Sequence, residues 1–279
     1  MGESILPANM KNTPYKAHPV ILILFIAGLI MLSCNRQKQE PAWELAWAEE
    51  FDYNGKPDAG YWGYEKGHIR NNELQYYTDQ LENVTVGDGV CTITAKLEDA
   101  DSITSASINT LGKYDIQYGR IEVRAKIPSS LGTWPAIWMM GINRSEVGWP
   151  ACGEIDIMEH VGYDPDQVHA NIHTKAYNHV QGTNKGNSID VPDPSDGFHL
   201  YALEWYTDHM DFFFDDSLYF TFQNDMAGDP DTWPFDQPHY LLINLAYGGG
   251  WGGREGVDTT QLPQRYVIDY VRHYTRSGT

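Results

Sequence analysis

The chain of 279 residues can hold one large β-domain or two small ones, and its 42% apolar residues are enough for a buried core. Thirty-eight acidic residues against 19 basic ones leave a formal net charge of −19, which repels nucleic acids, anionic lipid surfaces and sulfated polymers. We therefore expect a neutral partner and no nucleic-acid partner. Nine Trp and 18 Tyr exceed what such a core needs, and flat rings suit sugar faces, although some of them will fill the core.

The N-terminal segment has the pattern of an export signal. Lys11 and Lys16 precede an apolar run over residues 20–32, and small and polar residues follow it. The run is shorter than the roughly 20 residues of a membrane-spanning helix, which favours a cleavable signal core over a transmembrane anchor. We expect residues 1–33 to be a signal peptide of the lipoprotein type and the protein to be exported.

The end of this segment, Leu32-Ser33-Cys34, resembles a bacterial lipobox, in which signal peptidase cuts before a cysteine that carries diacylglycerol. Met31 stands where Leu is usual. The resemblance implies a lipid on Cys34, a polar tether over residues 34–40 and a location at the cell envelope. The alternative is an ordinary signal peptide with an incidental cysteine, which would make the protein secreted. No membrane contact other than this lipid anchor is expected.

Residues 41–279 are predicted to form one all-β domain. No stretch shows a sustained helical period, and turn signals rich in Gly and Asp separate segments with strand character. We expect an antiparallel β-sandwich of the jelly-roll type, with one sheet face open for a site, and a monomer. The predicted strands cover residues 90–97, 119–127, 136–140, 154–160, 168–173, 199–205, 210–214, 218–222, 239–246 and 265–274.

Two cysteines remain in this domain, Cys91 and Cys152. They are too few for a disulfide framework and have no C-x-x-C metal spacing. Both lie in apolar, strand-like segments, which favours two buried free thiols over one bridge between them.

The most informative segment is E-I-D-I-M-E at residues 154–159, because Asp and Glu are depleted in strands and three occur here between apolar residues. Strict alternation places Glu154 and Asp156 on one face and Glu159 in the core, where an unpaired charge costs several kcal/mol. A one-residue bulge near Met158 returns Glu159 to the polar face, and bulges are common beside active sites. An exposed strand with solvated acids is the alternative.

The two glutamates of this strand can act as a catalytic pair. A bulged strand brings the carboxyl groups of Glu154 and Glu159 to roughly 5–8 Å, which includes the separation in retaining glycosidases and overlaps the wider one in inverting enzymes. The spacing alone therefore does not select the stereochemistry. Asp156 lies between them, and its charge raises at least one pKa, as a site with one protonated and one ionised carboxyl requires.

Four further segments accompany this strand in order: NELQYYT at 72–78, YGRIEVRAKIP at 118–128, TWPAIWMM at 133–140 and NLAYGGGWGG at 244–253. Together they resemble glycoside hydrolase family 16 over residues 43–274. The resemblance implies a β-jelly roll with a substrate cleft across its concave sheet, and hydrolysis of β-glycosidic bonds with retention of configuration. It implies Glu154 as the nucleophile, Asp156 as the residue that tunes and orients the pair, and Glu159 as the acid/base.

The inserted Met158 is typical of the laminarinase-like, agarase and carrageenase branch, whereas relatives specific for mixed-linkage glucan tend to have E-x-D-x-E. Galactan hydrolases, above all those for sulfated polymers, should offer basic residues in the cleft, and this chain is acidic. We therefore expect an endo-β-1,3-glucanase for laminarin-type glucans, with mixed β-1,3/1,4 bonds also cut. A galactan hydrolase and a non-catalytic β-glucan-binding lectin are the alternatives.

Aromatic residues near the acidic strand are expected to bind sugar rings. Trp134 and Trp138 share a face on either side of Ala136, and the family resemblance places this pair in the cleft rather than in the core. Trp149 and Trp251 are expected to line its walls, with ordinary loop packing as the alternative.

Polar residues around the strand supply candidate hydrogen bonds. Asn71, Glu73 and Tyr77 could bind sugar hydroxyls, and the family position favours Asn71. His173 is expected to hydrogen-bond the substrate or the acid/base residue, with a structural histidine as the alternative.

No cofactor is expected to be required for catalysis. The histidines of this region lack a tetrahedral zinc spacing, so no zinc site is expected at His160, His169 and His173. The family often binds one structural calcium far from catalysis. The resemblance implies ligands from Glu50, Asp269 and a backbone carbonyl near Gly89, with two ordinary surface carboxylates as the alternative.

Overall fold

A computed structural model describes residues 42–99 and 102–276. The predicted signal peptide over residues 1–33, the lipidation site Cys34 and the tether over residues 34–40 lie outside the described residues. Within the described ranges, no helix combines the length and the apolar character that crossing a membrane requires.

The regular secondary structure of the described residues is almost all β-strand, with one short helix, α1 (Arg144–Val147), and one 3-10 turn, η1 (Thr259–Gln261). The strands are β1 (Trp43–Glu49), β2 (Gly63–Tyr64), β3 (Gln75–Tyr77), β4 (Val84–Gly87), β5 (Val90–Asp99), β6 (Ser102–Ser105), β7 (Ser107–Asn109), β8 (Asp115–Ile116), β9 (Gly119–Lys126), β10 (Thr133–Gly141), β11 (Glu154–Glu159), β12 (Gln167–His173), β13 (Lys185–Asp190), β14 (His199–Trp205), β15 (His209–Phe214), β16 (Ser217–Gln223), β17 (His239–Tyr247) and β18 (Gln264–Arg276).

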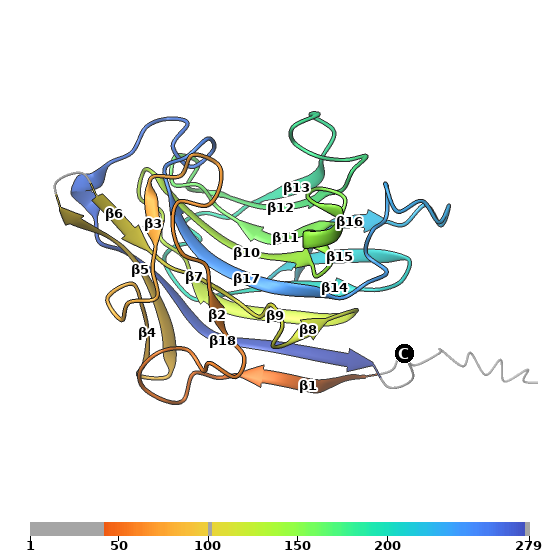
Figure 1. Cartoon of the computed structure of the whole chain (residues 1–279), viewed down its shortest axis with the longest axis horizontal. Coiled ribbons are helices and arrows are strands. Elements are labelled where there is room, and N and C mark those ends of the chain that lie inside the picture. Colours follow the sequence, from red (N-terminus) through yellow and green to blue (C-terminus); the bar gives the residue numbers. More distant parts are fainter. Residues whose placement is uncertain (1–41, 100–101, 277–279) are drawn as a thin grey trace, which may run out of the picture. The chain divides into compact units, whose positions relative to one another are not determined.

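The strands form two sheets that pack face to face (Figure 1). Among the described residues, a ten-stranded sheet has the order β16-β15-β14-β9-β18-β5-β6-β3, with β1 beside β18 and β4 beside β5. An eight-stranded sheet has the order β13-β12-β11-β10-β17-β7-β2, with β8 beside β17. Pairing is antiparallel except between β3 and β6. The predicted β-sandwich of the jelly-roll type is confirmed.

All ten predicted strands are present, and most of the strands that the sequence did not reveal are short or lack alternation. β2, β7 and β8 have two or three residues each, and β13 reads KGNSID, with a glycine and few apolar side chains. Such strands form because a neighbouring strand supplies hydrogen-bond partners, which local sequence does not record.

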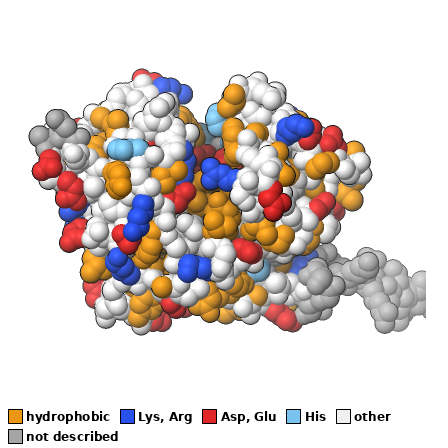
Figure 2. Space-filling view, viewed as in Figure 1, with side chains coloured by type: hydrophobic (Ala, Val, Ile, Leu, Met, Phe, Trp, Pro, Cys, Tyr) orange, Lys and Arg blue, Asp and Glu red, His pale blue; other side chains and the backbone are white. Residues whose placement is uncertain are grey.

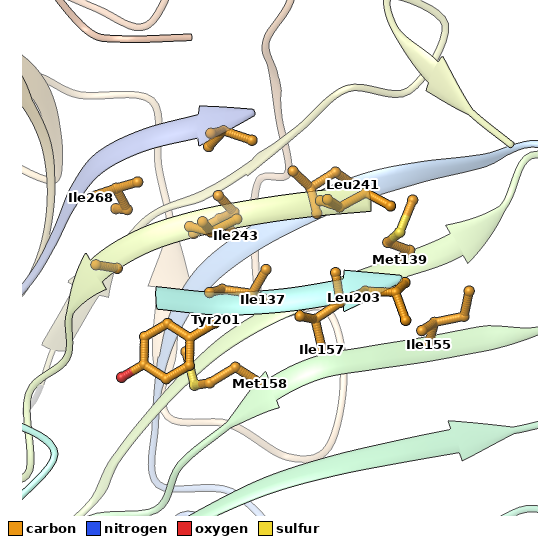
Figure 3. Packing of buried hydrophobic residues seen from close by; sticks show 14 of the residues in the cluster. Ile137, Met139, Ile155, Ile157, Met158, Tyr201, Leu203, Leu241, Ile243 and Ile268 are labelled. Atoms are coloured by element: carbon orange, nitrogen blue, oxygen red, sulfur yellow. The ribbon is translucent and has the colours of Figure 1, made fainter. Parts of the chain in front are cut away.

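The core lies between the two sheets and is almost entirely aliphatic and aromatic. Ile137 of β10, Ile155 of β11 and Ile243 of β17 point from the eight-stranded sheet toward Leu203 of β14 and Ile268 of β18 (Figure 3). All five side chains are fully buried. Because strand residues alternate between faces, this inward packing directs Trp134, Ala136, Trp138 and Met140 to the opposite face of the eight-stranded sheet.

The predicted bulge on β11 is confirmed. Ala136 and Ile137 of β10 pair with Glu159 and Met158, but the next residue of β10 pairs with Asp156, so Ile157 is an extra residue. Ile157 and Met158 are both buried and both point into the core (Figure 3). Two consecutive inward side chains shift the alternation by one residue and return Glu159 to the face that carries Asp156.

Cys91 and Cys152 are both buried free thiols, as expected, and they are not bridged. Burial raises the pKa of the Cys91 thiol far above its usual value. Burial raises the pKa of Cys152 to about 11. Neither group is therefore a thiolate near neutral pH, and both act as small apolar side chains.

Met158→Ala tests whether core packing holds the bulge. We expect a loss of about 2–4 kcal/mol in the free energy of unfolding, because a fully buried side chain leaves a cavity. Urea denaturation measures the loss. Leu218→Ala on β16 is the matched control, because Leu218 is 52% exposed and should cost less than about 0.5 kcal/mol. Equal losses in the two variants would contradict the inward packing of Met158.

Candidate active site

A cleft of about 870 Å³ runs over the face of the eight-stranded sheet that points away from the core. Figure 2 shows this hollow between two raised walls. Its floor comes from β10, β11, β12 and β17, and its walls include residues 70–73, Trp149, residues 179–184 and the glycine-rich segment around Trp251. Glu154, Asp156 and Glu159 all line it, so the bulged strand brings its three carboxyl groups into one cavity.

Glu154 lies at the start of β11 and is held by two rings. Trp149 Nε1 donates a hydrogen bond to Glu154 Oε2 at 2.8 Å. His173 Nε2, from the neighbouring strand β12, lies 3.8 Å from Glu154 Oε1 and 3.3 Å from Asp156 Oδ2. His173 therefore contacts the two carboxyl groups at this end of the strand.

Glu159 lies at the end of β11 and has an N–H donor on each oxygen. Trp134 Nε1, from β10, donates to Oε1 at 3.0 Å. Asn171 Nδ2, from β12, donates to Oε2 at 3.2 Å. The side chain is thus oriented by one neighbouring strand on each side and cannot rotate without losing a bond.

Burial governs the protonation of the three carboxyl groups. It raises the pKa of Glu154 to about 8 and that of Glu159 to about 8, and the charge of Asp156 acts on both in the same direction. Burial also raises the pKa of Asp156 well above its usual value. Because three buried like charges repel one another, we infer that the trio keeps at least one proton at neutral pH. A protonated acid and an ionised carboxylate can then coexist on one strand.

The predicted aromatic residues are all in the cleft, although not all as open platforms. The Trp251 and Trp134 rings meet edge to face, with centroids 5.4 Å apart, and form one wall of the cleft beside Glu159. Trp138 is different, because it is only 7% exposed and the Arg70 guanidinium lies 4.9 Å above its ring. Its Nε1 donates to Asn244 Oδ1 at 2.7 Å. Trp138 therefore forms part of the floor.

Asn71 lines the cleft, whereas Glu73 and Tyr77 belong mainly to a buried network beneath it. Asn71 Nδ2 donates to Glu73 Oε1 at 3.2 Å, and Tyr77 Oη donates to Glu73 Oε2 at 3.2 Å. Tyr77 is fully buried, so it positions its neighbours and does not reach a sugar. The main chain of Gly250 donates to the Asn71 carbonyl at 2.8 Å, which fastens the glycine-rich segment to this wall.

The structure answers one half of the prediction for His173. Its ring lies against Glu154 and Asp156 and not against the acid/base residue, because the register pairs His173 with Glu154. His173 lines the cleft, and its contact with a substrate stays a prediction. The same register places Asn171 opposite Asp156, where its amide reaches Glu159. Asn171 was not predicted, although its even spacing from His173 in VHANIH puts both on one face.

Other cleft residues also went unrecognised. The cleft contains further polar side chains, from loops, α1, β12 and β17, to which the sequence assigned no role in substrate binding, namely Arg70, Arg144, His169, His179, Asn184 and Asn244. Loop residues such as Asn184 reach the site only through the way the chain folds back, which spacing along the sequence does not reveal.

Two groups of acidic residues bear on metal binding. Among the described residues, the one group of three His, Cys, Asp or Glu side chains close enough to share an ion is Glu154, Asp156 and His173, which includes the candidate nucleophile. On the other sheet, Glu50 accepts two hydrogen bonds from Arg272, at 2.7 and 2.9 Å, and Asp269 is paired with Arg124. Each of these carboxylates is thus paired with an arginine, and a structural calcium bound by Glu50, Asp269 and the Gly89 carbonyl stays a prediction.

Residues 62–272 match the family described as Glycosyl hydrolases family 16. A β-glucanase from Rhodothermus marinus is 48% identical over 277 residues, which cover 95% of this chain and 96% of that protein. The chain belongs to family 16. It is therefore a glycoside hydrolase, as predicted.

Solved structures of family 16 enzymes resemble the chain closely. The laminarinase from Rhodothermus marinus is 50% identical, with a TM-score of 0.82 over 85% of this chain and 98% of that chain. A mutant of a non-specific endo-β-1,3(4)-glucanase, co-crystallised with 1,3-β-D-cellotriosyl-glucose, is 45% identical, with a TM-score of 0.80 over 85% of this chain and 98% of that chain.

Asp156→Asn tests how much folding stability the repulsion among the three carboxyl groups of this family 16 site costs. The folded state holds protons that the unfolded chain releases from about pH 4 upward, so stability falls as the pH rises toward about 8. Removing one acid should therefore raise the melting temperature more at pH 8 than at pH 4.5. Thermal unfolding at both pH values measures this. The exposed Asp216→Asn is the control, and an equal effect of Asp156→Asn at both pH values would contradict the buried repulsion.

Proposed function

We propose that this protein is an endo-acting hydrolase that cleaves internal β-1,3-glucosidic bonds of laminarin-type glucans with retention of configuration. Glu154 is the nucleophile and Glu159 is the acid/base. The observation that carries the proposal is the bulge on β11, which places two partly buried carboxyl groups on the floor of one cleft with the buried Asp156 between them. A retaining glycosidase needs such a pair on either side of the scissile bond.

In the first step, the Glu154 carboxylate attacks the anomeric carbon and forms a glycosyl ester. The bond from that carbon to the bridging oxygen breaks, and Glu159 gives its proton to the oxygen, so the leaving sugar departs as an alcohol. The hydrogen bond from Trp149 keeps the attacking carboxylate in place. The raised pKa of Glu159, which its burial causes, keeps it protonated for this step near neutral pH.

In the second step, the Glu159 carboxylate removes a proton from water, and the water oxygen attacks the anomeric carbon. The glycosyl ester breaks, and Glu154 leaves as a carboxylate. The N–H donors of Trp134 and Asn171 stabilise the ionised Glu159 that this step requires. Asp156, beside His173, shares protons with Glu154 and tunes the pair.

The choice of a neutral glucan rests on the relatives and on charge. The relatives described above are named a β-glucanase, a laminarinase and an endo-β-1,3(4)-glucanase, so mixed-linkage glucan is a second substrate. A sulfated galactan would need several free cations in the cleft, but its lining offers two arginines and no lysine, and Arg70 is paired with Glu65. A pure lectin has no use for three buried carboxyl groups, because their repulsion costs stability.

We also propose that the protein is exported and held at the cell envelope by a lipid on Cys34, as a monomer. The support is the apolar run over residues 20–32 and the lipobox-like segment that follows it.

Glu154→Ala and Glu159→Ala separate the two proposed roles. Each variant should lose reducing-end release from laminarin by about 10²-fold or more, because each removes one partner of the reaction. With an aryl β-laminaribioside and azide, Glu154→Ala should give the α-glycosyl azide, because azide takes the place of the missing nucleophile. Glu159→Ala should give the β-glycosyl azide, because azide then attacks the glycosyl ester. Product anomers are read by NMR.

The exposed Glu146→Ala on α1 is the matched control and should keep wild-type turnover. Reversed anomers would exchange the assigned roles, and the same anomer from both active-site variants would refute them. The substrate class is checked separately, by incubating the wild-type enzyme with laminarin, lichenan, agarose and carrageenan. Products from a galactan and none from laminarin would refute the glucanase.

A further inference from the structure

The Asn171 side-chain amide lies between the acid/base glutamate and strand β13. Its Nδ2 donates to Glu159 Oε2 at 3.2 Å, and its Oδ1 accepts from Asn184 Nδ2 at 3.0 Å. An amide has a donor end and an acceptor end, whereas an ionised carboxylate can only accept. The direction in which this amide points therefore decides whether an N–H or a carbonyl faces Glu159.

A glycine on strand β13 leaves room for the carbonyl end of the Asn171 amide. Gly186 pairs with Asn171 across the two strands. A Cβ atom on Gly186 would lie 2.3 Å from Asn171 Oδ1 and 2.5 Å from the Ala170 carbonyl oxygen, so any other residue would collide with the amide. The glycine thus leaves space for Oδ1 at the point where Asn184 supplies its donor.

Asn184 is held beside Asn171 by a loop that its own hydrogen bonds close. Asn178 is buried, and its Nδ2 donates to the main-chain carbonyls of Thr174 and Lys175, at 3.2 and 3.3 Å. The main chains of Asn178 and Thr183 are also linked, because the Thr183 N–H donates to the Asn178 carbonyl at 3.0 Å. Asn184 follows this closed turn directly, so its side chain is presented to Asn171 by a fixed backbone.

We propose that Asn184 is a positioning residue that acts through Asn171: it fixes the amide of Asn171 so that an N–H, and not a carbonyl, faces Glu159. This inference rests on the role of Glu159 in the proposed function. Asn184 does not touch Glu159 itself. It selects the orientation that stabilises the ionised form of the acid/base residue, which the second step of the reaction uses.

The groups around Glu159 show why the hydrogen bond from Asn171 matters for its pKa. Asp156 and Glu154 face it from β11, His169 and His173 from β12, and Tyr219 from β16. Burial and the Asp156 charge favour the protonated form, and only the hydrogen bonds from Trp134 and Asn171 and the charge of His173 oppose them. Loss of the Asn171 donor should therefore raise the pKa of Glu159.

The test is the pH dependence of kcat/KM on laminarin for Asn184→Ala and Asn184→Asp. The alkaline limb reports the acid that must be protonated in the free enzyme, so it should move to higher pH by about 0.5–1 unit in Asn184→Ala. The shift should be larger in Asn184→Asp. An aspartate there can only accept, so it attracts the N–H of Asn171 and turns Oδ1 toward Glu159.

Asn187→Asp is the matched control, because it adds the same charge to β13 while its own side chain bonds the Tyr219 carbonyl at 2.6 Å and not Asn171. It should move the alkaline limb by much less than Asn184→Asp. Equal shifts in these two variants, or an unmoved limb in Asn184→Asp beside a lowered melting temperature, would overturn the inference. A wild-type enzyme that releases no reducing ends from laminarin would instead refute the proposed function.

Discussion

The repulsion among three carboxyl groups buried on one strand is the constraint on which the rest of the site depends. Asp156 is only 3% exposed, and it lies between Glu154 and Glu159. A regular strand would have divided these acids between the cleft and the core, but the extra Ile157 keeps them together. Because they cannot all be ionised at neutral pH, the fold itself supplies the protonated acid that double displacement needs.

The partners of these acids differ from those of acids elsewhere in the domain. Glu50, next to β1, is paired with Arg272, and Asp269 of β18 is paired with Arg124, so each of these acids lies beside a full positive charge. In the cleft, Glu159 is instead held by an indole and an amide, which orient it and carry no net charge. Neutral donors fix the geometry and leave the acid able to keep its proton.

The sequence predicted the bulge and the cleft-facing tryptophans because side chains alternate between the two faces of a strand. A glutamate placed in the core by alternation is so costly that the residue pattern alone predicts a bulge near Met158. Trp134 was found because it shares a face with Trp138, but Arg70, which covers the Trp138 ring, comes from a distant segment with no periodic signal. Asn184 was missed for the same reason, since its contact depends on how β13 pairs with β12. Local alternation finds residues on strands, whereas pairing between strands decides their neighbours.

The central claim is that these three carboxyl groups share protons, and a ¹³C NMR titration of the side-chain carboxyl carbons in the free enzyme tests it most directly. The account predicts that at least one of Glu154, Asp156 and Glu159 remains protonated at pH 6.5 and titrates only near pH 8, in steps that belong to the group as a whole. Titration of all three carboxyl groups below about pH 5, at the values of exposed Asp and Glu, would contradict it.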